Sequence, residues 1–210
     1  MRADISWDDA RSLLEERLTR CGINFPLDSF WPRLEAYFEA FEREASGLKL
    51  TAIKSRGELI RGPVFESLFL ASHLPLEGPC ADLGTGAGIP GFIVKIARPE
   101  LQISLLEAYP PRVEFLKQLA QKLKISGIEA LCCHVGFEGS VPEAPVALAR
   151  GYGSVDKFVL HAAKYLKARK AFYLWRKDVE PWKSEILPLK LVKRLSLPER
   201  PVELLYWQAS

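Results

Sequence analysis

The residues from Pro79 to Gly91 have the types and spacing of a loop that binds a nucleotide-like ligand. A short apolar run containing Asp82 leads into glycines at positions 84, 86, 88 and 91. Glycine adopts positive φ values and lacks the Cβ that would keep a ligand away from the backbone. The helix expected after the loop would point free N–H groups at that ligand. The loop therefore predicts a cofactor that contains a nucleoside.

A second chemical group, the carboxylate of Glu107, ends the next expected strand. In nucleotide-binding folds, an acidic residue at about this distance from a glycine turn binds the ribose. Its two acceptor oxygens suit two neighbouring hydroxyl donors. We therefore expect Glu107 to hold the ribose of the cofactor.

The segment from Gly86 to Gly91 also matches the G-x-G-x-x-G pattern of dinucleotide enzymes, a match that is weak by itself. Three features argue against a dinucleotide. Gly84 comes before the pattern and follows Asp82 at the strand end. Tyr152 and Lys157 are wrongly spaced for a hydride-transfer pair on one helical turn, and no second half of the sheet is present to hold a nicotinamide.

The elements that position these residues follow from hydrophobic periodicity. Ser6 is expected to cap a first helix, a second helix begins near Asp28 or Ser29, and a third covers 64–73. Strands are expected at 80–84, 102–107, 128–134, 146–150, 170–176 and 203–207, with helices near 90–98, 110–124, 154–167 and 179–186. Alternating strands and helices predict an α/β fold with a mostly parallel sheet.

The last two expected strands lack a convincing helix between them, so a hairpin-like pair is expected to make the sheet mixed. We place an N-terminal helical extension at 1–75, packed on the core, and the sheet domain at 76–210. Neither an internal repeat nor a low-complexity segment is evident.

The composition is that of an ordinary globular protein, with 210 residues, 48% of them hydrophobic and 26% charged. The sequence has no apolar run long enough to span a membrane and no secretory signal at its start. The four cysteines form no metal-binding pattern and suit buried positions in a reducing compartment. A cytoplasmic monomer without a metal or membrane contact is expected.

The net charge of +3 is unevenly distributed along the chain. Residues 150–194 contain twelve basic and four acidic side chains, whereas residues 1–50 contain seven basic and ten acidic ones. This asymmetry predicts a polyanionic partner facing the C-terminal half. A set of solvated lysines on helices and loops is the alternative interpretation.

The run from Ala81 to Gly88 resembles the first motif of the class I S-adenosylmethionine-dependent methyltransferases. Such a domain has a seven-stranded, Rossmann-like mixed sheet with one reversed strand. The resemblance implies that S-adenosyl-L-methionine is the cofactor and that Asp82 lies near its methionine end. A turn or cap role for Asp82 is the alternative.

The residues after the fourth expected strand, 149–154, supply neither a cysteine nucleophile nor the Asn/Asp-Pro-Pro turn that holds an exocyclic amine. They also supply no evident general base. The N7 atom of guanine has a free lone pair and attacks a methyl donor without first losing a proton. Placement of N7 against the methyl group can then supply most of the acceleration.

The whole chain resembles the bacterial 16S ribosomal RNA guanine-N7 methyltransferases, also called glucose-inhibited division protein B. The matching residues are 50–53, 66–68, 82–91, 96–101, 105–108, 112, 115–116, 149–150, 172–174 and 176–177. The resemblance implies methyl transfer from S-adenosylmethionine to N7 of a guanosine in 16S ribosomal RNA, with that RNA or the 30S subunit as partner.

The resemblance also implies the site residues. Those for the cofactor are Asp82, Gly84, Thr85, Gly86, Gly88, Glu107, Ala108, Gly136, Phe137, Glu138 and Arg150. Arg150 would also position the substrate as the catalytic residue, and the alternative is an ion pair with Glu107 or Glu138. Those for RNA are Arg112, Arg176 and Lys177.

The chain departs from the family pattern on the acceptor side. The departures are Lys49, Gly62-Pro63, Glu66, Gly151-Tyr152 and the register of Arg176-Lys177. They leave open a diverged methyltransferase for another RNA, a protein or a small molecule. A non-catalytic S-adenosylmethionine-binding partner of the ribosome is a further alternative.

Overall fold

The computed structural model describes residues 4–44, 47–48, 53, 55–75, 78–137, 141–177 and 188–209. The helices are α1 (Trp7–Arg20), α2 (Leu27–Glu44), α3 (Arg56–Leu59), the π-helix η1 (Ile60–Val64), α4 (Phe65–Ala71), α5 (Gly91–Ala97), α6 (Pro110–Lys122) and α7 (Val155–Tyr165). The strands are β1 (Cys80–Leu83), β2 (Ile103–Glu107), β3 (Ile128–Cys132), β4 (Val146–Arg150), β5 (Lys170–Arg176), β6 (Lys190–Ser196) and β7 (Val202–Gln208).

The seven strands form one sheet in the order β3-β2-β1-β4-β5-β7-β6. Strands β1 to β5 pair in parallel, and β7 runs antiparallel to both β5 and β6. The carboxyl ends of β1, β2, β3 and β4 therefore meet at one edge of the sheet, where ligands bind in folds of this kind. The expected mixed, mostly parallel sheet is confirmed.

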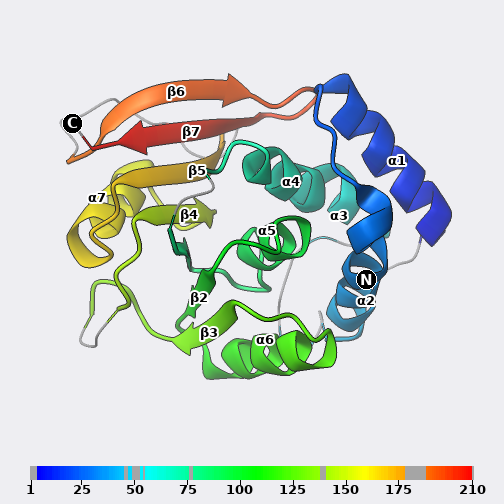
Figure 1. Cartoon of the computed structure of the whole chain (residues 1–210), viewed down its shortest axis with the longest axis horizontal. Coiled ribbons are helices and arrows are strands. Elements are labelled where there is room, and N and C mark those ends of the chain that lie inside the picture. Colours follow the sequence, from blue (N-terminus) through cyan, green and yellow to red (C-terminus); the bar gives the residue numbers. More distant parts are fainter. Residues whose placement is uncertain are drawn as a thin grey trace.

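Helices cover both faces of the sheet, and the strand residues alternate between two hydrophobic clusters (Figure 1). On β5, Phe172 and Leu174 face the cluster that includes α4, α5 and α6, while Tyr173 and Trp175 face the cluster around α7. In Figure 1, α7 lies on one side of the strands, and α1 and α2 lie on the other. This alternation is why strands of such apolar sequence are buried on both faces.

The N-terminal helices begin as expected and belong to the main core. Ser6 caps α1 by accepting a 3.0 Å hydrogen bond from the N–H of Asp9. The buried residues of α1 and α2 join the same cluster as α4, α5 and α6. The division at residue 75 stays a prediction. Among the described helices, none has both the length and the apolar character needed to cross a bilayer.

Two elements were missing from the expectations. Strand β6 is an edge strand whose alternation is broken by a register shift between Leu191 and Lys193, so the period-2 pattern is lost. The turn from α3 into η1 also formed no part of the prediction, although Ser55 caps α3 at the N–H of Glu58. The helix expected near 179–186 lies outside the described residues.

Candidate active site at the carboxyl edge of the sheet

Asp82 lies near the end of β1 with almost no exposure. Its Oδ2 accepts hydrogen bonds from the Thr85 hydroxyl at 2.6 Å and from the Gly91 N–H at 2.8 Å. Burial raises the pKa of Asp82 to about 7, although both hydrogen bonds favour the charged form. Its Oδ1 is buried and has no hydrogen-bond partner among the described residues. Asp82 therefore fixes the glycine turn with one oxygen and keeps the other available.

The glycines of the turn fulfil different needs. A Cβ on Gly91 would lie 2.5 Å from the Leu105 side chain and 2.7 Å from Oδ2 of Asp82, so glycine lets α5 begin against the strands. A Cβ on Gly86 would meet only the Gly84 carbonyl oxygen, at 4.0 Å. The φ of Gly86 is +59°, in the left-handed region. Gly86 is thus the position where the backbone is open to a ligand.

The N-terminal extension holds this turn directly. Tyr37 of α2 is fully buried and donates a 2.9 Å hydrogen bond from its hydroxyl to the carbonyl oxygen of Ala87. Its ring stacks on Phe92 of α5 with centroids 5.3 Å apart. No sequence signal identifies this contact, because apolar and aromatic residues at helical spacing indicate core packing and do not identify a hydroxyl partner.

Glu107 ends β2 as expected, and its carboxylate is hydrogen-bonded to the glycine turn. One carboxylate oxygen accepts from the Gly86 N–H and the other from the Tyr109 N–H, both at 2.9 Å. Arg112, predicted to bind RNA, lies 3.8 Å from Glu107 and has its guanidinium 5.7 Å from the centre of the Tyr109 ring. The structure therefore brings Arg112 to the predicted ribose site.

The turn after β3 lies at the same edge. Gly136 has φ +94°, and a Cβ there would lie 2.8 Å from the ring of His161. Phe137 is 68% exposed, which is unusual for a phenylalanine, and its ring lies 4.2 Å from that of His134. An exposed aromatic ring beside the carboxyl end of β3 suits contact with a flat base. Ala108 is exposed, and Glu138 lies outside the described residues.

Arg150 ends β4 and pairs with a buried carboxylate. Its Nε donates to Oε2 of Glu66 at 2.6 Å, while Nε and Nη2 of Arg200 donate to Oε1 at 3.2 and 3.0 Å. Glu66 has no exposed side-chain surface, whereas Arg150 and Arg200 remain 23% and 30% exposed. The described ion-pair partner of Arg150 is therefore Glu66 of α4 and not Glu107, one of the two partners in the alternative interpretation; the other, Glu138, lies outside the described residues.

Arg200 was absent from the sequence prediction. It lies in the turn between β6 and β7, and a Cβ on Gly62 would come within 3.1 Å of its Nη2 atom. Gly62 also has non-helical φ and ψ angles inside η1. The departure from the family pattern at this glycine thus provides the space that the second arginine occupies.

Tyr152 lies over the first glycine of the turn. A Cβ on Gly84 would be 2.8 Å from Cδ2 of Tyr152, and the tyrosine hydroxyl shares a 2.9 Å hydrogen bond with Nδ1 of His161. Burial raises the pKa of Tyr152 to about 12. The loop is further fixed by Tyr173, whose hydroxyl donates to the Gly153 carbonyl at 2.7 Å.

The basic pair at the end of β5 lies beside a different carboxylate, Glu203. Lys177 lies 2.8 Å from Glu203, which also accepts two hydrogen bonds from Arg194. Burial opposes ionisation of Glu203, but the bonds from Lys177 and Arg194 outweigh it and lower its pKa. Arg176 is exposed.

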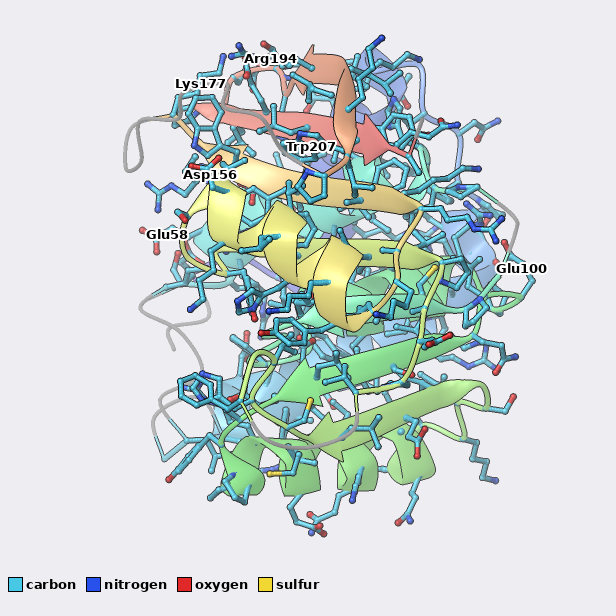
Figure 2. The ribbon with its side chains drawn as sticks, turned by 90° about the vertical axis from the view of Figure 1, so that its left-hand side faces the viewer. Glu58, Glu100, Asp156, Lys177, Arg194 and Trp207 are labelled. Carbon is cyan, nitrogen blue, oxygen red and sulfur yellow. The ribbon has the colours of Figure 1, made fainter. Side chains whose placement is uncertain are left out.

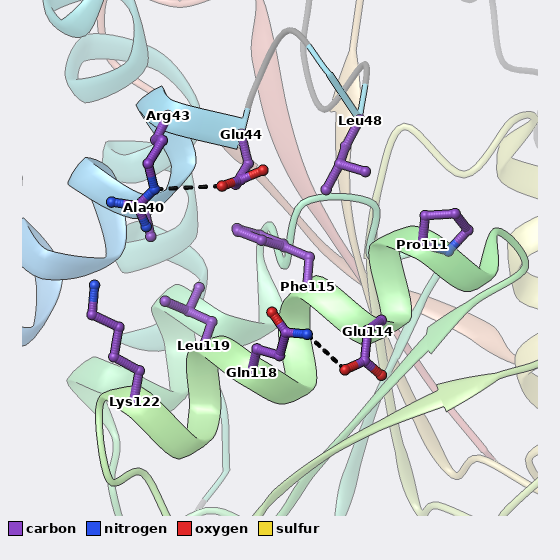
Figure 3. A pocket seen from close by; sticks show the side chains of 10 residues that line it. All are labelled: Ala40, Arg43, Glu44, Leu48, Pro111, Glu114, Phe115, Gln118, Leu119 and Lys122. Atoms are coloured by element: carbon purple, nitrogen blue, oxygen red, sulfur yellow. Dashed lines mark hydrogen bonds and ion pairs between the residues drawn. The ribbon is translucent and has the colours of Figure 1, made fainter.

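A pocket of about 230 Å³ lies elsewhere, between α2 and α6 (Figure 3). Arg43 and Glu44 pair at one side of it, and Gln118 bonds Glu114 at the other. None of the predicted site residues lines this pocket. The carboxyl edge of the sheet, where these residues gather, is therefore the candidate active site.

Comparison with known proteins agrees with this geometry. Residues 31–185 match the family model described as GidB, rRNA small subunit methyltransferase G. The chain belongs to this family. It is 44% identical over 140 residues to the ribosomal RNA small subunit methyltransferase G of Moorella thermoacetica, a match covering 64% of this chain and 58% of that relative. The relative of the same name from Methylobacillus flagellatus is 27% identical over 88% of this chain and 89% of its own.

Solved structures of other methyltransferases have the same overall fold. A SAM-dependent methyltransferase from Aquifex aeolicus superposes with a TM-score of 0.56 at 13% identity, over 79% of this chain and 98% of that one. Magnesium protoporphyrin IX methyltransferase from Synechocystis gives 0.57 at 11% identity, over 82% and 94%. The chain thus belongs to the family described as rRNA small subunit methyltransferase G and has the fold of SAM-dependent methyltransferases.

The residues at the carboxyl edge fit this cofactor. Oδ1 of Asp82 is a buried acceptor without a described partner, which suits a cationic ammonium group. Gly86 is open to a ligand, and Glu107 retains acceptor capacity for ribose hydroxyls. Hydrogen-bond acceptors and a glycine backbone that no side chain covers thus lie together at the carboxyl edge of the sheet.

Proposed function

We propose that the chain transfers a methyl group from S-adenosylmethionine to N7 of a guanosine in 16S ribosomal RNA. Family membership indicates methyl transfer to ribosomal RNA. The arrangement of carboxylates at the carboxyl edge of the sheet supports guanine N7 as the atom that accepts the methyl group. An acceptor that needs no deprotonation fits a site in which the described buried carboxylates have other partners.

The observation that supports this choice is that each buried carboxylate described at this edge has protein partners, and the one oxygen left over, Oδ1 of Asp82, is assigned to the ammonium group of the cofactor. Asp82 holds Thr85 and Gly91, and Glu107 holds two backbone N–H groups. Glu66 holds two arginines, and Glu203 holds Lys177 and Arg194. The Tyr152 hydroxyl, with its raised pKa, is a poor base at neutral pH. Amine or hydroxyl acceptors, which must lose a proton, fit such a site less well than N7 does.

The residues would act by placement. S-adenosylmethionine supplies the electrophilic methyl group when bound, and Asp82, Gly86 and Glu107 would hold its polar ends. Phe137 would contact the adenine. Arg150 has a partly exposed guanidinium whose Nη atoms have no partner among the described residues, so it can bind a phosphate or a guanine edge.

We further propose that the protein works as a cytoplasmic monomer on 16S RNA or the 30S subunit. Arg176 and Lys177 lie at the carboxyl end of β5 and would contact RNA there. Arg112 would act nearer the ribose of the cofactor. The molar mass in solution, measured by light scattering, tests the oligomeric state.

The acceptor class is tested with labelled S-adenosylmethionine and intact 30S particles, followed by separation of RNA from protein. We expect the label in the RNA. Label in ribosomal protein would support the protein-methyltransferase alternative. Tight cofactor binding without transfer to RNA or protein would support a non-catalytic role, and binding of NADH in place of S-adenosylmethionine would contradict the cofactor itself.

A further inference from the structure

The outer side of α7 and the chain that follows it form an exposed basic surface. It consists of Lys157, Leu160, Lys164, Lys167 and Arg169, and is called the α7 surface below. Leu160 is 49% exposed, which is high for a leucine. The residues at 157, 160 and 164 follow helical spacing and share one side of α7, and Lys167 and Arg169 lie in the chain that follows the helix.

The lysines of the α7 surface are not neutralised. Within the described part of the chain, no carboxylate lies within ion-pair distance of Lys157, Lys164 or Lys167. Four bases at the ends of β4 and β5 and in the β6–β7 hairpin differ, because buried Glu66 and Glu203 each pair with two of them. Lys190 and Lys193 of β6 are exposed as well. The α7 surface is therefore one exposed group of cations whose lysines have no carboxylate partner in the described part of the chain.

The α7 surface starts at the reaction edge. Figure 2 looks onto this face, with α7 lying across the front of the strands. Asp156, in the first turn of α7, is on the left, and Glu100, which precedes β2 and so marks the amino edge of the sheet, is on the right. At the left-hand end, the Lys157 ammonium lies 5.6 Å from the centre of the Tyr152 ring, which itself covers Gly84.

The α7 surface ends at a pocket of about 460 Å³ on the opposite edge. Lys167, Arg169 and Lys170 contribute to its lining, together with one carboxylate, Glu143. The Lys167 ammonium also donates to the Lys164 carbonyl at the end of α7. A helix of eleven residues spans roughly 16 Å, so the basic pocket is more than one nucleotide away from the reaction edge.

We propose that the α7 surface binds the sugar–phosphate backbone of the RNA that flanks the methylated nucleotide, with one phosphate in the basic pocket. This inference rests on the RNA substrate proposed above. The cations of the α7 surface have no carboxylate partners and begin beside the proposed reaction site. The RNA chain on either side of the acceptor nucleotide carries a negative phosphate at every step, so it can follow this surface away from the site. The exposed Leu160 allows contact with apolar parts of sugars or bases.

The test compares two triple variants of the full-length protein. One removes charge at the far end of the α7 surface, Lys164→Gln, Lys167→Gln and Arg169→Gln. The matched control removes three exposed lysines of α6 and the turn after it, Lys117→Gln, Lys122→Gln and Lys124→Gln, on the other face of the sheet. Binding to free 16S RNA is measured over a series of salt concentrations, with S-adenosylmethionine affinity and thermal unfolding as folding controls.

We expect the α7 variant to bind RNA more weakly and to reduce the slope of log K against log salt by about 2 to 3. Its KM for RNA should rise while kcat and cofactor affinity stay unchanged. Equal slopes for the two variants would overturn the proposal. Weaker binding to 30S particles with unchanged binding to free 16S RNA would also overturn it, because the partner would then be a ribosomal protein. Failure of the wild-type protein to methylate RNA would instead contradict the function proposed above.

Discussion

The hydroxyl of Tyr37 donates a 2.9 Å hydrogen bond to the carbonyl oxygen of Ala87, fifty residues further along the chain. This contact ties α2 to the turn between Gly86 and Gly88. The N-terminal helix α2 thus contacts the proposed cofactor site and packs in the same core as α5. A peptide fixed in this way keeps its N–H groups in place for a ligand before the ligand arrives.

Tyr37→Phe should weaken S-adenosylmethionine binding and lower stability by about 1–3 kcal/mol, because the buried Ala87 carbonyl loses its partner. Calorimetric titration and urea unfolding measure the two effects. Leu34→Ala, a packing change in the same helix, provides the control: it should lower stability while leaving cofactor affinity unchanged. Unaltered affinity in Tyr37→Phe would remove the residue from the cofactor site.

Gly86→Ala and Gly91→Ala should fail in different ways. At Gly86 the new methyl group meets open space, so the protein should fold with a cost of about 1–2 kcal/mol for its left-handed φ, while cofactor affinity falls. At Gly91 the methyl group would meet Leu105 and Asp82, and thermal unfolding should show a severe loss of stability. If Gly86→Ala bound S-adenosylmethionine as tightly as the wild-type protein, the cofactor would not lie against the backbone at Gly86.

Asp82 should make cofactor binding depend on pH. Its pKa rises from 3.8 to about 7 in the folded protein, so its protonated form is favoured by folding. The stability from this group is complete below about pH 4 and is lost as the pH rises through 7. A bound ammonium favours the ionised form, so S-adenosylmethionine should bind about tenfold more tightly at pH 8 than at pH 6.

Asp82→Asn separates charge from hydrogen bonding in that experiment. The amide oxygen can still accept from Thr85 and Gly91, but the side chain no longer titrates. Titration calorimetry should therefore show weaker binding that no longer changes between pH 6 and pH 8. A pH dependence that survives in this variant would assign the titration to another group.

Arg150→Lys keeps a cation beside Glu66 but removes the planar fork that can bind a phosphate or a guanine edge. We expect turnover to fall on the order of 100-fold from misplacement of the acceptor, with cofactor affinity nearly unchanged. Glu66→Gln should lower the free energy of unfolding by about 2–3 kcal/mol, since two arginines lose a buried partner. Normal turnover in Arg150→Lys would leave Arg150 a structural role only.

The features that could be predicted from the sequence are those that depend on residues close together in the chain. Asp82 and Glu107 lie at the ends of short apolar runs, and parallel strands bring such ends to one edge, so their proximity could be expected. Ser55 and Glu58 also carry a capping signal that could have revealed α3.

What depends on distant contacts could not be predicted. Glu66 joins Arg150 and Arg200 across 84 and 134 residues, and no local pattern indicates such partners. The spacing of apolar residues around Tyr37 is typical of a buried helix face, but the partner of its hydroxyl depends on how α2 packs. Strand β6 combines three basic residues with a bulge, and edge strands of this kind lack the apolar alternation that reveals a strand.

The central claim is tested most directly by identifying the methylated nucleoside. Wild-type protein, S-adenosylmethionine and unmethylated 16S RNA or 30S particles are incubated together, and the RNA is digested and analysed by mass spectrometry. We predict 7-methylguanosine in the wild-type reaction and a strong reduction with Arg150→Lys. Another methylated nucleoside, without 7-methylguanosine, would contradict the proposed acceptor atom.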